Sequence, residues 1–470
     1  MNDSMIVGRH TLFPYIKVRL RLFARHAEID RAVFFGLLRR GWRLCSEPVA
    51  AILIAIKFTP ELQGYYYTFA TILALQVFVE LGLGTVIIQF ASHEWSKLNI
   101  DKSGHIVGDR NSLSRLVSLA GFACKWYLFG GILTAIGLGI GGYIFFSTSP
   151  NTNIHWVSPW FLLCFITGLT ICLVPVWSLL EGCNQVAQLY TFRFFQTILT
   201  SISIWIAILV GADLWTASIS GMTTFLCSVF FLKRRYWIFL KTLLLSKPNG
   251  PKINWRIDML PMQWRIGVGW IGGYFIFSFF VPVLFKYHGS LVAGQMGMTW
   301  NIVGIMGALS ASWLTPRAPQ FGILIAQKRY DNLDKQLWKV TKIVIGVSAF
   351  TALIVWLIVF LLNIVDYSIA ARFASRILPP LPTGLLLLAQ FLSVTTVPFS
   401  TYLRAHKKEP LMFPSLIYAV LVGCSTFFLG KYYSAMGMAF GYLIVNIIFV
   451  PIVFLIWYRC RTEWHKFEGA

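Results

Sequence analysis

The feature that most constrains this chain is a series of apolar runs, each about 20 residues long, that recur between residues 35 and 458. A run of this length suffices for an α-helix to cross the hydrocarbon core of a bilayer, which is about 30 Å thick. Lipid offers the backbone no hydrogen-bond partner, so each crossing segment must satisfy its own backbone within a helix. With 57% hydrophobic and only 12% charged residues, the chain has more apolar surface than a soluble domain can bury. The sequence therefore predicts an all-α, polytopic membrane protein.

Windows of this length predict about twelve transmembrane helices. They lie near residues 35–58, 65–92, 117–147, 157–180, 189–210, 213–232, 263–286, 291–314, 340–363, 378–403, 411–430 and 433–458. If the N-terminus is cytoplasmic, all but five of the 40 Lys and Arg residues fall on the cytoplasmic side. The five exceptions are Lys57, Lys286, Arg372, Arg376 and Lys431. Because short cytoplasmic loops retain basic residues, this bias predicts twelve spans with both termini in the cytoplasm.

The longest hydrophilic stretch, Lys233 to Arg265, divides six predicted spans from six. We therefore predict two six-helix lobes, and the second echoes the first weakly, with Gly294 in the place of Gly64. The predicted parts are a basic cytoplasmic or interfacial segment at 1–31, an N-terminal lobe at 32–240, a cytoplasmic linker at 241–262, a C-terminal lobe at 263–460 and a cytoplasmic tail at 461–470. The eight cysteines have no metal or redox spacing, so we expect neither a disulfide nor a metal site.

Charged residues within the first two spans point to function. Arg40, Arg43, Glu47 and Lys57 recur at helical spacing and so share one face of the first helix. Glu80 lies in the second span, before glycines that would let another helix approach closely. A charge at the centre of a bilayer costs about 2.5 to 3.5 kcal/mol even on insertion scales, so such faces look into a bundle or a wet cavity. This arrangement is typical of a transport protein.

Glycines are the second signal for helix packing. Gly82 and Gly84 follow Glu80, and Gly137 and Gly141 repeat at a spacing of four in the third span. Small residues at such spacings let helix backbones approach each other in a membrane. We therefore expect all four glycines to lie at helix contacts.

Three segments carry a family resemblance, namely LLEGCNQVAQLYTFRFFQTI, TPRAPQFGILIAQKRYDNLDKQLWKVTK and TYLRAHKKEPLMFPSLIYAVLVGCSTFFLGKYYSAMGMAFGYL. They resemble the oligosaccharide (O-antigen-type) flippases, which belong to the multidrug/oligosaccharidyl-lipid/polysaccharide (MOP) superfamily. The resemblance extends from about Arg31 to Tyr458 and rests on turns, a glycine and a proline rather than on a catalytic signature. It implies a V-shaped bundle of two lobes that opens alternately to the two sides of the bacterial inner membrane. The implied substrate is a polyprenyl (undecaprenyl)-diphosphate-linked oligosaccharide, moved for the synthesis of O-antigen, capsule or exopolysaccharide.

The resemblance also implies a cationic central cavity near helices 1, 2, 7 and 8. By position, the candidate substrate-binding residues are Arg40, Arg43, Lys57, Arg193, Arg265, Lys286 and Arg317. Arginine suits this role because its guanidinium donates two parallel hydrogen bonds to phosphate oxygens. Arg193 has an alternative reading, in which its side chain extends to the membrane interface. Glu47 and Glu80 are the candidates for proton or sodium coupling, and Glu47 has the alternative of a structural ion pair with Arg43.

Several other functions remain alternatives. A multidrug or cation antiporter of the same superfamily would need an acidic cavity, whereas the charged faces here are mainly basic. A fourteen-span lipid II flippase would need two further spans. A membrane-bound polymerase would need acids or histidines on the outer side, where Glu61, His155, His288 and Asp366 are scattered. We therefore predict no enzyme activity, no cofactor and no nucleic-acid partner. The expected partners are the lipid bilayer and the substrate, and polysaccharide polymerase and chain-length proteins are candidate partners.

Overall fold

The computed structural model describes residues 31–101, 105–148, 154–314, 317–365, 367–406 and 408–468. The predicted N-terminal segment up to residue 30, and the last two residues of the predicted tail, lie outside these ranges. Regular structure in the described residues is helical, apart from one antiparallel pair of short strands, β1 (Leu98–Ile100) and β2 (Ile106–Gly108), in which Asn99 is opposite Val107. This hairpin follows α5 (Leu83–Trp95) and was not predicted from the sequence.

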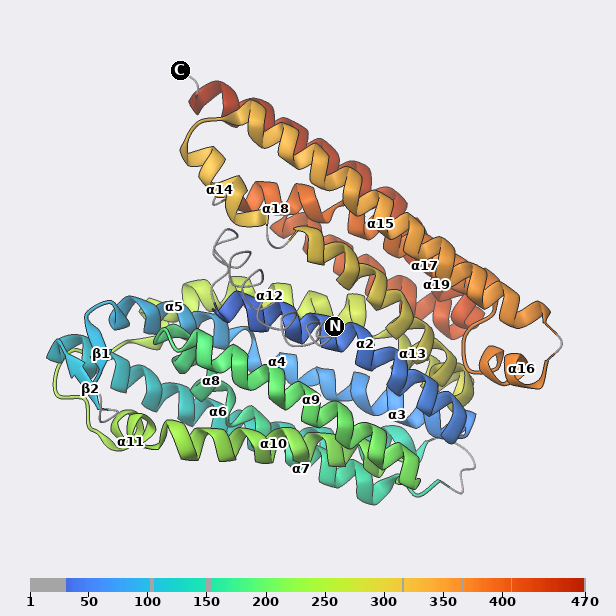
Figure 1. The fold of residues 1–470 in the computed structure, drawn as a ribbon, viewed down its shortest axis with the longest axis horizontal. Coiled ribbons are helices and arrows are strands. Elements are labelled where there is room, and N and C mark those ends of the chain that lie inside the picture. Colours follow the sequence, from blue (N-terminus) through green and yellow to red (C-terminus); the bar gives the residue numbers. More distant parts are fainter. Residues whose placement is uncertain are drawn as a thin grey trace, which may run out of the picture.

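The helices form the two arms of a V, which meet at one end and separate at the other (Figure 1). One arm contains α2 (Arg31–Lys57), α3 (Pro60–Leu73), η1 (Ala74–Gln76), α4 (Val77–Glu80), α5 (Leu83–Trp95), α6 (Arg110–Ser147), α7 (Val157–Ile171), α8 (Val174–Gly182), α9 (Val186–Val210), α10 (Trp215–Arg235) and α11 (Trp237–Leu245). We call it the N-terminal arm. After η2 (Trp255–Met259), α12 (Leu260–Phe277) lies along the N-terminal arm in the same view.

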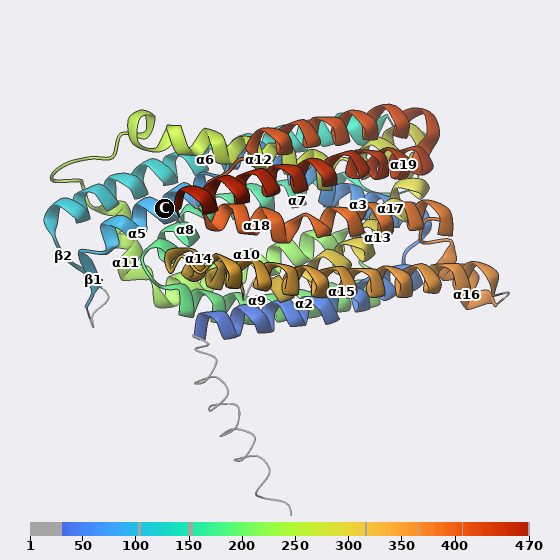
Figure 2. The ribbon, with the colours of Figure 1, turned by 90° about the horizontal axis from the view of Figure 1, so that it is seen from above.

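The other, C-terminal arm contains most of the remaining helices (Figures 1 and 2). They are α13 (Phe280–Leu314), α14 (Ala318–Ala326), α15 (Tyr330–Ile364), α16 (Ser368–Ala374), α17 (Pro380–Thr395), α18 (Val397–Ala405) and α19 (Met412–Glu468). We call the end where the arms meet the closed end. The other end, which carries β1, β2, α11, α14 and the C-terminus, is the open end.

Two of the helices contain a reversal of the chain. In α13 the backbone turns at Gly289, with φ 85° and ψ 175°, and the rings of Phe280 and Trp300 meet across the turn at 4.7 Å. In α19 it turns at Ser434, with φ 56°, and the rings of Tyr418 and Phe449 meet at 4.4 Å. The segments on either side of each turn therefore pack against one another as antiparallel neighbours.

In the part of the chain that the structure describes, length and apolar composition qualify eight helices as candidate membrane spans, or nine if the bent pair formed by α3–α4 and α5 counts as one span. Two of the eight stretches contain the reversals at Gly289 and Ser434. α2 is not among them, because charged residues interrupt its apolar run. The prediction of an all-α, multi-pass membrane protein with two arms is confirmed. The count of twelve spans and the placement of both termini in the cytoplasm stay predictions.

Three hydrophobic clusters explain the shape. The largest joins both arms at the closed end and includes Tyr65, Phe146, Phe280 and Tyr442. The second joins the N-terminal arm to η2 and α12, and the third lies within the C-terminal arm alone. The arms therefore share one core at the closed end and have separate cores elsewhere, which is the arrangement expected of two bodies that meet at a hinge.

The second predicted span is interrupted. Its axis bends by 47° between α3–α4 and α5. At the bend, two consecutive residues, Leu81 (φ 45°) and Gly82 (φ 69°), adopt left-handed backbone conformations. Such a conformation is costly for leucine, and tertiary contacts must stabilise it. α12 provides one of these contacts, since a Cβ at Gly267 would lie 3.1 Å from the carbonyl oxygen of Leu81.

The glycine predictions divide into two groups. A Cβ at Gly82 would lie 2.3 Å from Ile266, and one at Gly84 would lie 3.1 Å from the hydroxyl of Ser178, so both positions are close helix contacts as predicted. Gly137 and Gly141, by contrast, are exposed, and no atom lies within 4 Å of either Cβ position. The prediction that Gly137 and Gly141 pack against another helix is therefore wrong for this conformation of the protein.

Candidate functional site in the space between the arms

The closed end is built on a contact between two glycines. A Cβ at Gly64 in α3 would lie 1.9 Å from the carbonyl oxygen of Ser290, and one at Gly294 in α13 would lie 2.9 Å from the amide nitrogen of Gly64. Any side chain at Gly64 would thus force the helices apart. The two glycines that the sequence repeat aligns are therefore the point where the arms cross.

Hydrogen bonds between the arms surround this crossing. The Gln63 side chain, which is 1% exposed, donates from Nε2 to the carbonyl oxygens of Gly294 and Arg376, each at 2.9 Å. Arg376 in turn donates to the carbonyl oxygen of Phe58. Burial, and then the positive charge of Arg372, lower the pKa of Arg376. The closed end thus contains a buried cation that donates to one carbonyl oxygen of the other arm, together with the buried Gln63 amide, within an apolar core.

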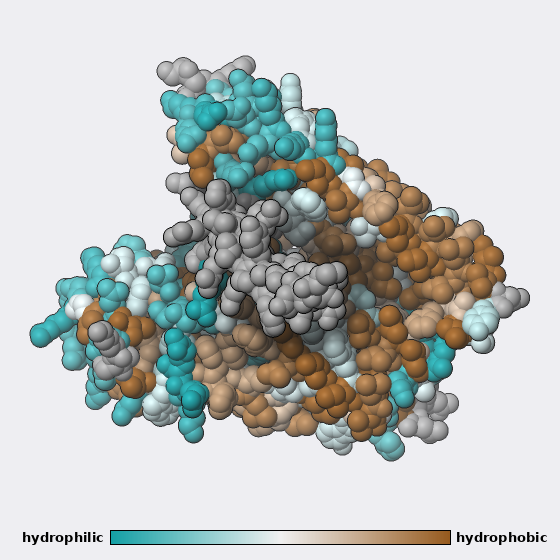
Figure 3. Space-filling view, viewed as in Figure 1, coloured by the Kyte–Doolittle hydropathy of each residue, from teal (hydrophilic) through white to brown (hydrophobic). Residues whose placement is uncertain are grey.

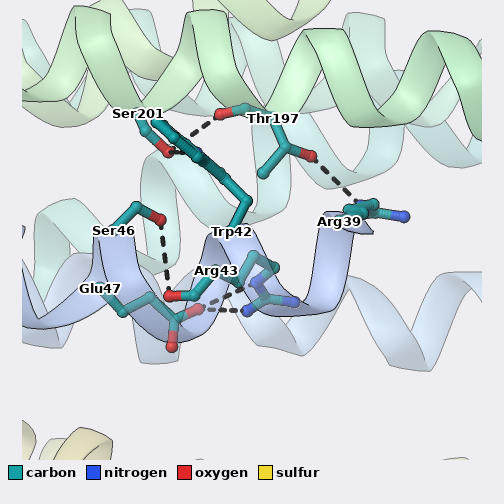
Figure 4. Close-up of polar contacts among 7 residues, drawn as sticks. All are labelled: Arg39, Trp42, Arg43, Ser46, Glu47, Thr197 and Ser201. Atoms are coloured by element: carbon teal, nitrogen blue, oxygen red, sulfur yellow. Dashed lines mark hydrogen bonds and ion pairs between the residues drawn. The ribbon is translucent and has the colours of Figure 1, made fainter. Parts of the chain in front are cut away.

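The N-terminal half of α2 is anchored to α9. Arg39 donates to the hydroxyl of Thr197 at 3.2 Å, and the Trp42 indole nitrogen donates to the hydroxyl of Ser201 at 3.2 Å (Figure 4). Arg43 and Glu47 lie on another face of α2, where they form an ion pair of 2.7 Å between Nη2 and Oε1 with both side chains about half exposed. Arg39 is thus a packing residue, whereas Arg43 and Glu47 remain accessible.

α12 contacts both arms and so shapes the space between them. At Gly267 it touches Leu81 of the N-terminal arm, as described above. At Gly272 it touches the C-terminal arm, where a Cβ would lie 3.1 Å from that of Ala419 in α19. Because the first turns of α12 follow the N-terminal arm, they separate from α18 and from the start of α19.

This separation leaves a recess of about 530 Å³ between α12, α18 and the start of α19. Its charged residues are Arg265, Arg404, Lys408 and Glu409. Its apolar lining includes Val268, Ile276, Phe277, Leu403 and Leu416. The volume lies within the range of about 300 to 1,000 Å³ that is usual for ligand pockets. We call this space, with the residues named here, the α12 recess.

The other predicted binding residues lie in four different places. Arg40 is exposed on α2, like Arg43. Lys57 ends α2 at the closed end, where Lys286 also lies and donates to the hydroxyl of Thr148 at 2.7 Å. Arg193 forms an ion pair of 3.8 Å with Glu181 inside the N-terminal arm. The structure therefore does not gather the predicted cations into one cluster.

Arg317 and Glu80 are the two remaining candidates. Arg317 precedes α14 at the open end, and its Nη1 is buried without a hydrogen-bond partner among the described residues. Glu80 ends α4 within the N-terminal arm, where its Oε1, the Ser178 hydroxyl and the Tyr127 hydroxyl all lie within 3.6 Å of the Cβ position of Gly84. Glu80 is therefore beside polar hydroxyls, whereas Glu47 already has a cationic partner.

Two recess residues, Arg404 and Lys408, were not among the predicted site residues. Both belong to a segment with the spacing of an ordinary basic cytoplasmic loop, and only the position of α12 turns them toward a shared space with Arg265. Within the described ranges, no three His, Cys, Asp or Glu side chains are placed to hold a metal ion. Of the outer-side residues considered for an enzyme, His288 contacts the carbonyl oxygen of Gly430 at 2.7 Å, and Asp366 lies outside the described residues.

Solved structures with a similar arrangement are transporters. An inward-facing multidrug resistance MATE family transporter of the MOP superfamily matches 90% of this chain and 99% of its own, with a TM-score of 0.57 and 12% identity. The lipid II flippase MurJ in an inward closed conformation matches 90% of this chain and 87% of its own, with a TM-score of 0.57 and 14% identity. This chain has the fold of MOP superfamily transporters.

A third MOP superfamily transporter extends the range of that fold. It comes from Pyrococcus furiosus and is described by the reverse polarity of its binding pocket. It matches 93% of this chain and 97% of its own, with a TM-score of 0.54 and 13% identity. No family model and no curated protein matches the chain. At these identities the likeness concerns the MOP fold alone, so the more specific resemblance to O-antigen flippases stays a prediction.

Proposed function

We propose that this protein is a flippase that moves a polyprenyl (undecaprenyl)-diphosphate-linked oligosaccharide across the bacterial inner membrane by alternating access. The product would serve the synthesis of O-antigen, capsule or exopolysaccharide. The observation that carries the proposal is the excess of cations over acids in the space between the arms. Among the described residues, Arg40 and Arg43 on α2 lie near Glu47, which is already paired with Arg43, and the three cations of the α12 recess share its lining with one acid, Glu409.

This charge balance favours an anionic substrate. A diphosphate that leaves water for a low-dielectric cavity loses solvation, and guanidinium groups can replace part of it with charge-assisted hydrogen bonds. The exposed apolar residues of α2, such as Phe34 (46%) and Ile52 (48%), leave a surface that suits the lipid tail while the glycan occupies the space between the arms. The positive-inside rule assigns the open end to the cytoplasm, where such a substrate is made.

A multidrug antiporter is the second candidate function, since the MATE transporter and the lipid II flippase have equal TM-scores with this chain. A cationic drug would need acidic side chains to receive it, and the charges described above have the opposite sign. The flippase proposal also includes coupling of transport to a proton or sodium gradient through Glu80 or Glu47. It predicts that Glu80→Gln or Glu47→Gln abolishes the response of transport to an imposed proton or sodium gradient.

The sidedness of the lipid-linked oligosaccharide in cells depleted of this protein tests the function. An external enzyme that modifies only outward-facing glycans gives the readout. We expect complete lipid-linked glycan to accumulate and to stay protected from that enzyme. Exposed but unpolymerised glycan would instead support a polymerase, and no change in the glycan pool would favour the multidrug antiporter.

Two substitutions test the cationic residues in the same assay. We expect Arg43→Ala and Arg317→Ala to lower transport at least about tenfold at matched expression, because each removes a charge-assisted contact of about 1.5 to 3 kcal/mol. The matched control is Arg234→Ala, which removes an exposed arginine at the end of α10. Normal transport by both test variants would contradict the role given to these arginines.

A further inference from the structure

We propose that the α12 recess binds the phosphate-bearing head of a membrane lipid at the open end of the molecule. The choice of ligand rests on the proposed function, since a polyprenyl diphosphate is such a lipid. The site itself rests on the recess geometry, on its charge and on the order in which charged and apolar residues line it. Arg404 and Lys408 are new assignments, and Arg265 gains a specific place among the candidate cations.

The charge of the recess is unbalanced. Its lining contains Arg265, Arg404 and Lys408 against one acid, Glu409. None of the ion pairs formed within the described part of the chain includes any of these four residues. Two of the cations instead lie over aromatic rings, with Lys408 Nζ 4.7 Å from the centre of the Trp464 ring and Arg265 Cζ 5.7 Å from that of Trp264. Aromatic faces orient a cation without neutralising it, so its charge remains available to an anion.

The order of the lining fits a lipid rather than a free anion. Arg404, Lys408 and Glu409 lie at the end of α18 and in the turn before α19, which is the mouth of the recess at the open end. Farther along α12 and α19, the walls consist of apolar residues such as Phe277 and Leu416. Outside the recess the apolar surface continues with exposed Phe413 (68%) and Ile417 (61%) on α19. A site with cations at its mouth and apolar walls beyond them matches a phosphate head and the start of an acyl or prenyl chain.

Two glycines of α12 leave space in the recess that side chains would otherwise fill. No atom lies within 4 Å of the Cβ positions of Gly269 and Gly273, both of which line it from α12. The α12 side of the recess therefore has room for a headgroup as wide as a diphosphate. At Gly272, between these two glycines, α12 approaches Ala419 of α19.

Binding to the full-length protein in nanodiscs of zwitterionic lipid tests the site. The probes are farnesyl diphosphate, inorganic pyrophosphate, and phosphatidylglycerol added to the nanodisc as a competitor. We expect the double variant R404Q/K408Q to weaken farnesyl diphosphate binding at least about tenfold, because two charge-assisted contacts are lost. The charge-conserving variant R404K/K408R should remain within about threefold of the wild type.

The matched control is R234Q/R235Q, which removes two exposed cations from the end of α10. An equal loss of affinity in this control would show a general electrostatic effect and overturn the proposal, as would unchanged affinity in R404Q/K408Q. Pyrophosphate that binds as tightly as farnesyl diphosphate would overturn the lipid part of the proposal. Competition by phosphatidylglycerol would support it with a phospholipid as the ligand, and resistance to that competitor would support it with a prenyl diphosphate.

A second variant covers a failure of R404Q/K408Q to yield monodisperse protein. Ser415→Phe fills the recess from α19 without changing its charge, and we expect it to weaken farnesyl diphosphate binding to a similar degree. Unchanged binding by Ser415→Phe would overturn the site. The binding assay does not depend on transport. Loss of binding in R404Q/K408Q, together with a negative sidedness assay, would contradict the proposed function alone. Intact binding in R404Q/K408Q would contradict this site alone.

Discussion

α8 in the N-terminal arm and α18 in the C-terminal arm are alike in sequence pattern but differ in the charge near their ends. We call the end of each of these helices, with its neighbours, the junction of its arm. In the N-terminal arm, α8 begins with Val174 and Pro175 and reaches Glu181 seven residues after Val174; in the C-terminal arm, α18 begins with Val397 and Pro398 and reaches Arg404 seven residues after Val397. Glu181 pairs with Arg193, and the seam between α2 and α9 beside it is closed by hydrogen bonds. At the other junction an arginine replaces the acid, and the α12 recess is open.

The same supersecondary pattern thus supports helix packing in the N-terminal arm and, in our proposal, lines a binding site in the C-terminal arm. In the N-terminal arm, Glu181 pairs with Arg193 of α9, the helix that packs against α2. In the C-terminal arm the arginine joins Arg265 and Lys408, and mutual repulsion of three cations disfavours the approach of α12 to α18. An anionic ligand would relieve that repulsion.

The largest effect is expected from giving the C-terminal junction the charge of the N-terminal one. Arg404→Glu should lower the initial rate of lipid-linked oligosaccharide transport in proteoliposomes more than tenfold, because the new acid neutralises Lys408 or Arg265 and repels a phosphate. Arg234→Glu, with the same change of charge at the end of α10, is the control. Transport at the wild-type rate in Arg404→Glu would show that the two junctions do not differ in function.

A smaller effect, on stability rather than on transport, is expected at the N-terminal junction. Glu181→Gln removes the partner of Arg193, and both side chains are about a quarter exposed, so the free energy of unfolding should fall by about 1 kcal/mol. Denaturant unfolding in detergent measures this change, and transport should stay within about twofold of the wild type. A loss of transport as large as that of Arg404→Glu would mean that the seam between α2 and α9 also handles substrate.

Much of the architecture follows from the sequence. The apolar runs predict membrane helices because lipid leaves the backbone no alternative, and the spacing of Arg40, Arg43 and Glu47 places them on one face of α2. The weak repeat aligned Gly64 with Gly294, and the structure shows that these two glycines meet where the arms cross. What these patterns lack is information on which helices become neighbours, because that depends on packing between segments far apart in the chain.

The errors and omissions have the same cause. Gly137 and Gly141 lie in a helix that is apolar on all sides, and such a helix gives no sign of which side faces lipid and which faces protein. Arg404 and Lys408 resemble any basic loop until α12 is placed beside them. The break at Leu81 could not be foreseen, because a leucine with positive φ has no signature of its own in the sequence. Positions that depend on tertiary contacts are therefore the ones that the sequence left open.

The glycine contact at the closed end has a mechanical consequence. Gly64 and Gly294 meet without side chains, so in the proposed alternating access neither of these two residues needs a rotamer change when the arms rotate about this point. With its 27 residues, α2 is about 40 Å long, and a rotation of about 10° at the glycines would move its far end by about 7 Å. A small change of angle at the closed end would therefore widen or narrow the space between the arms at the open end.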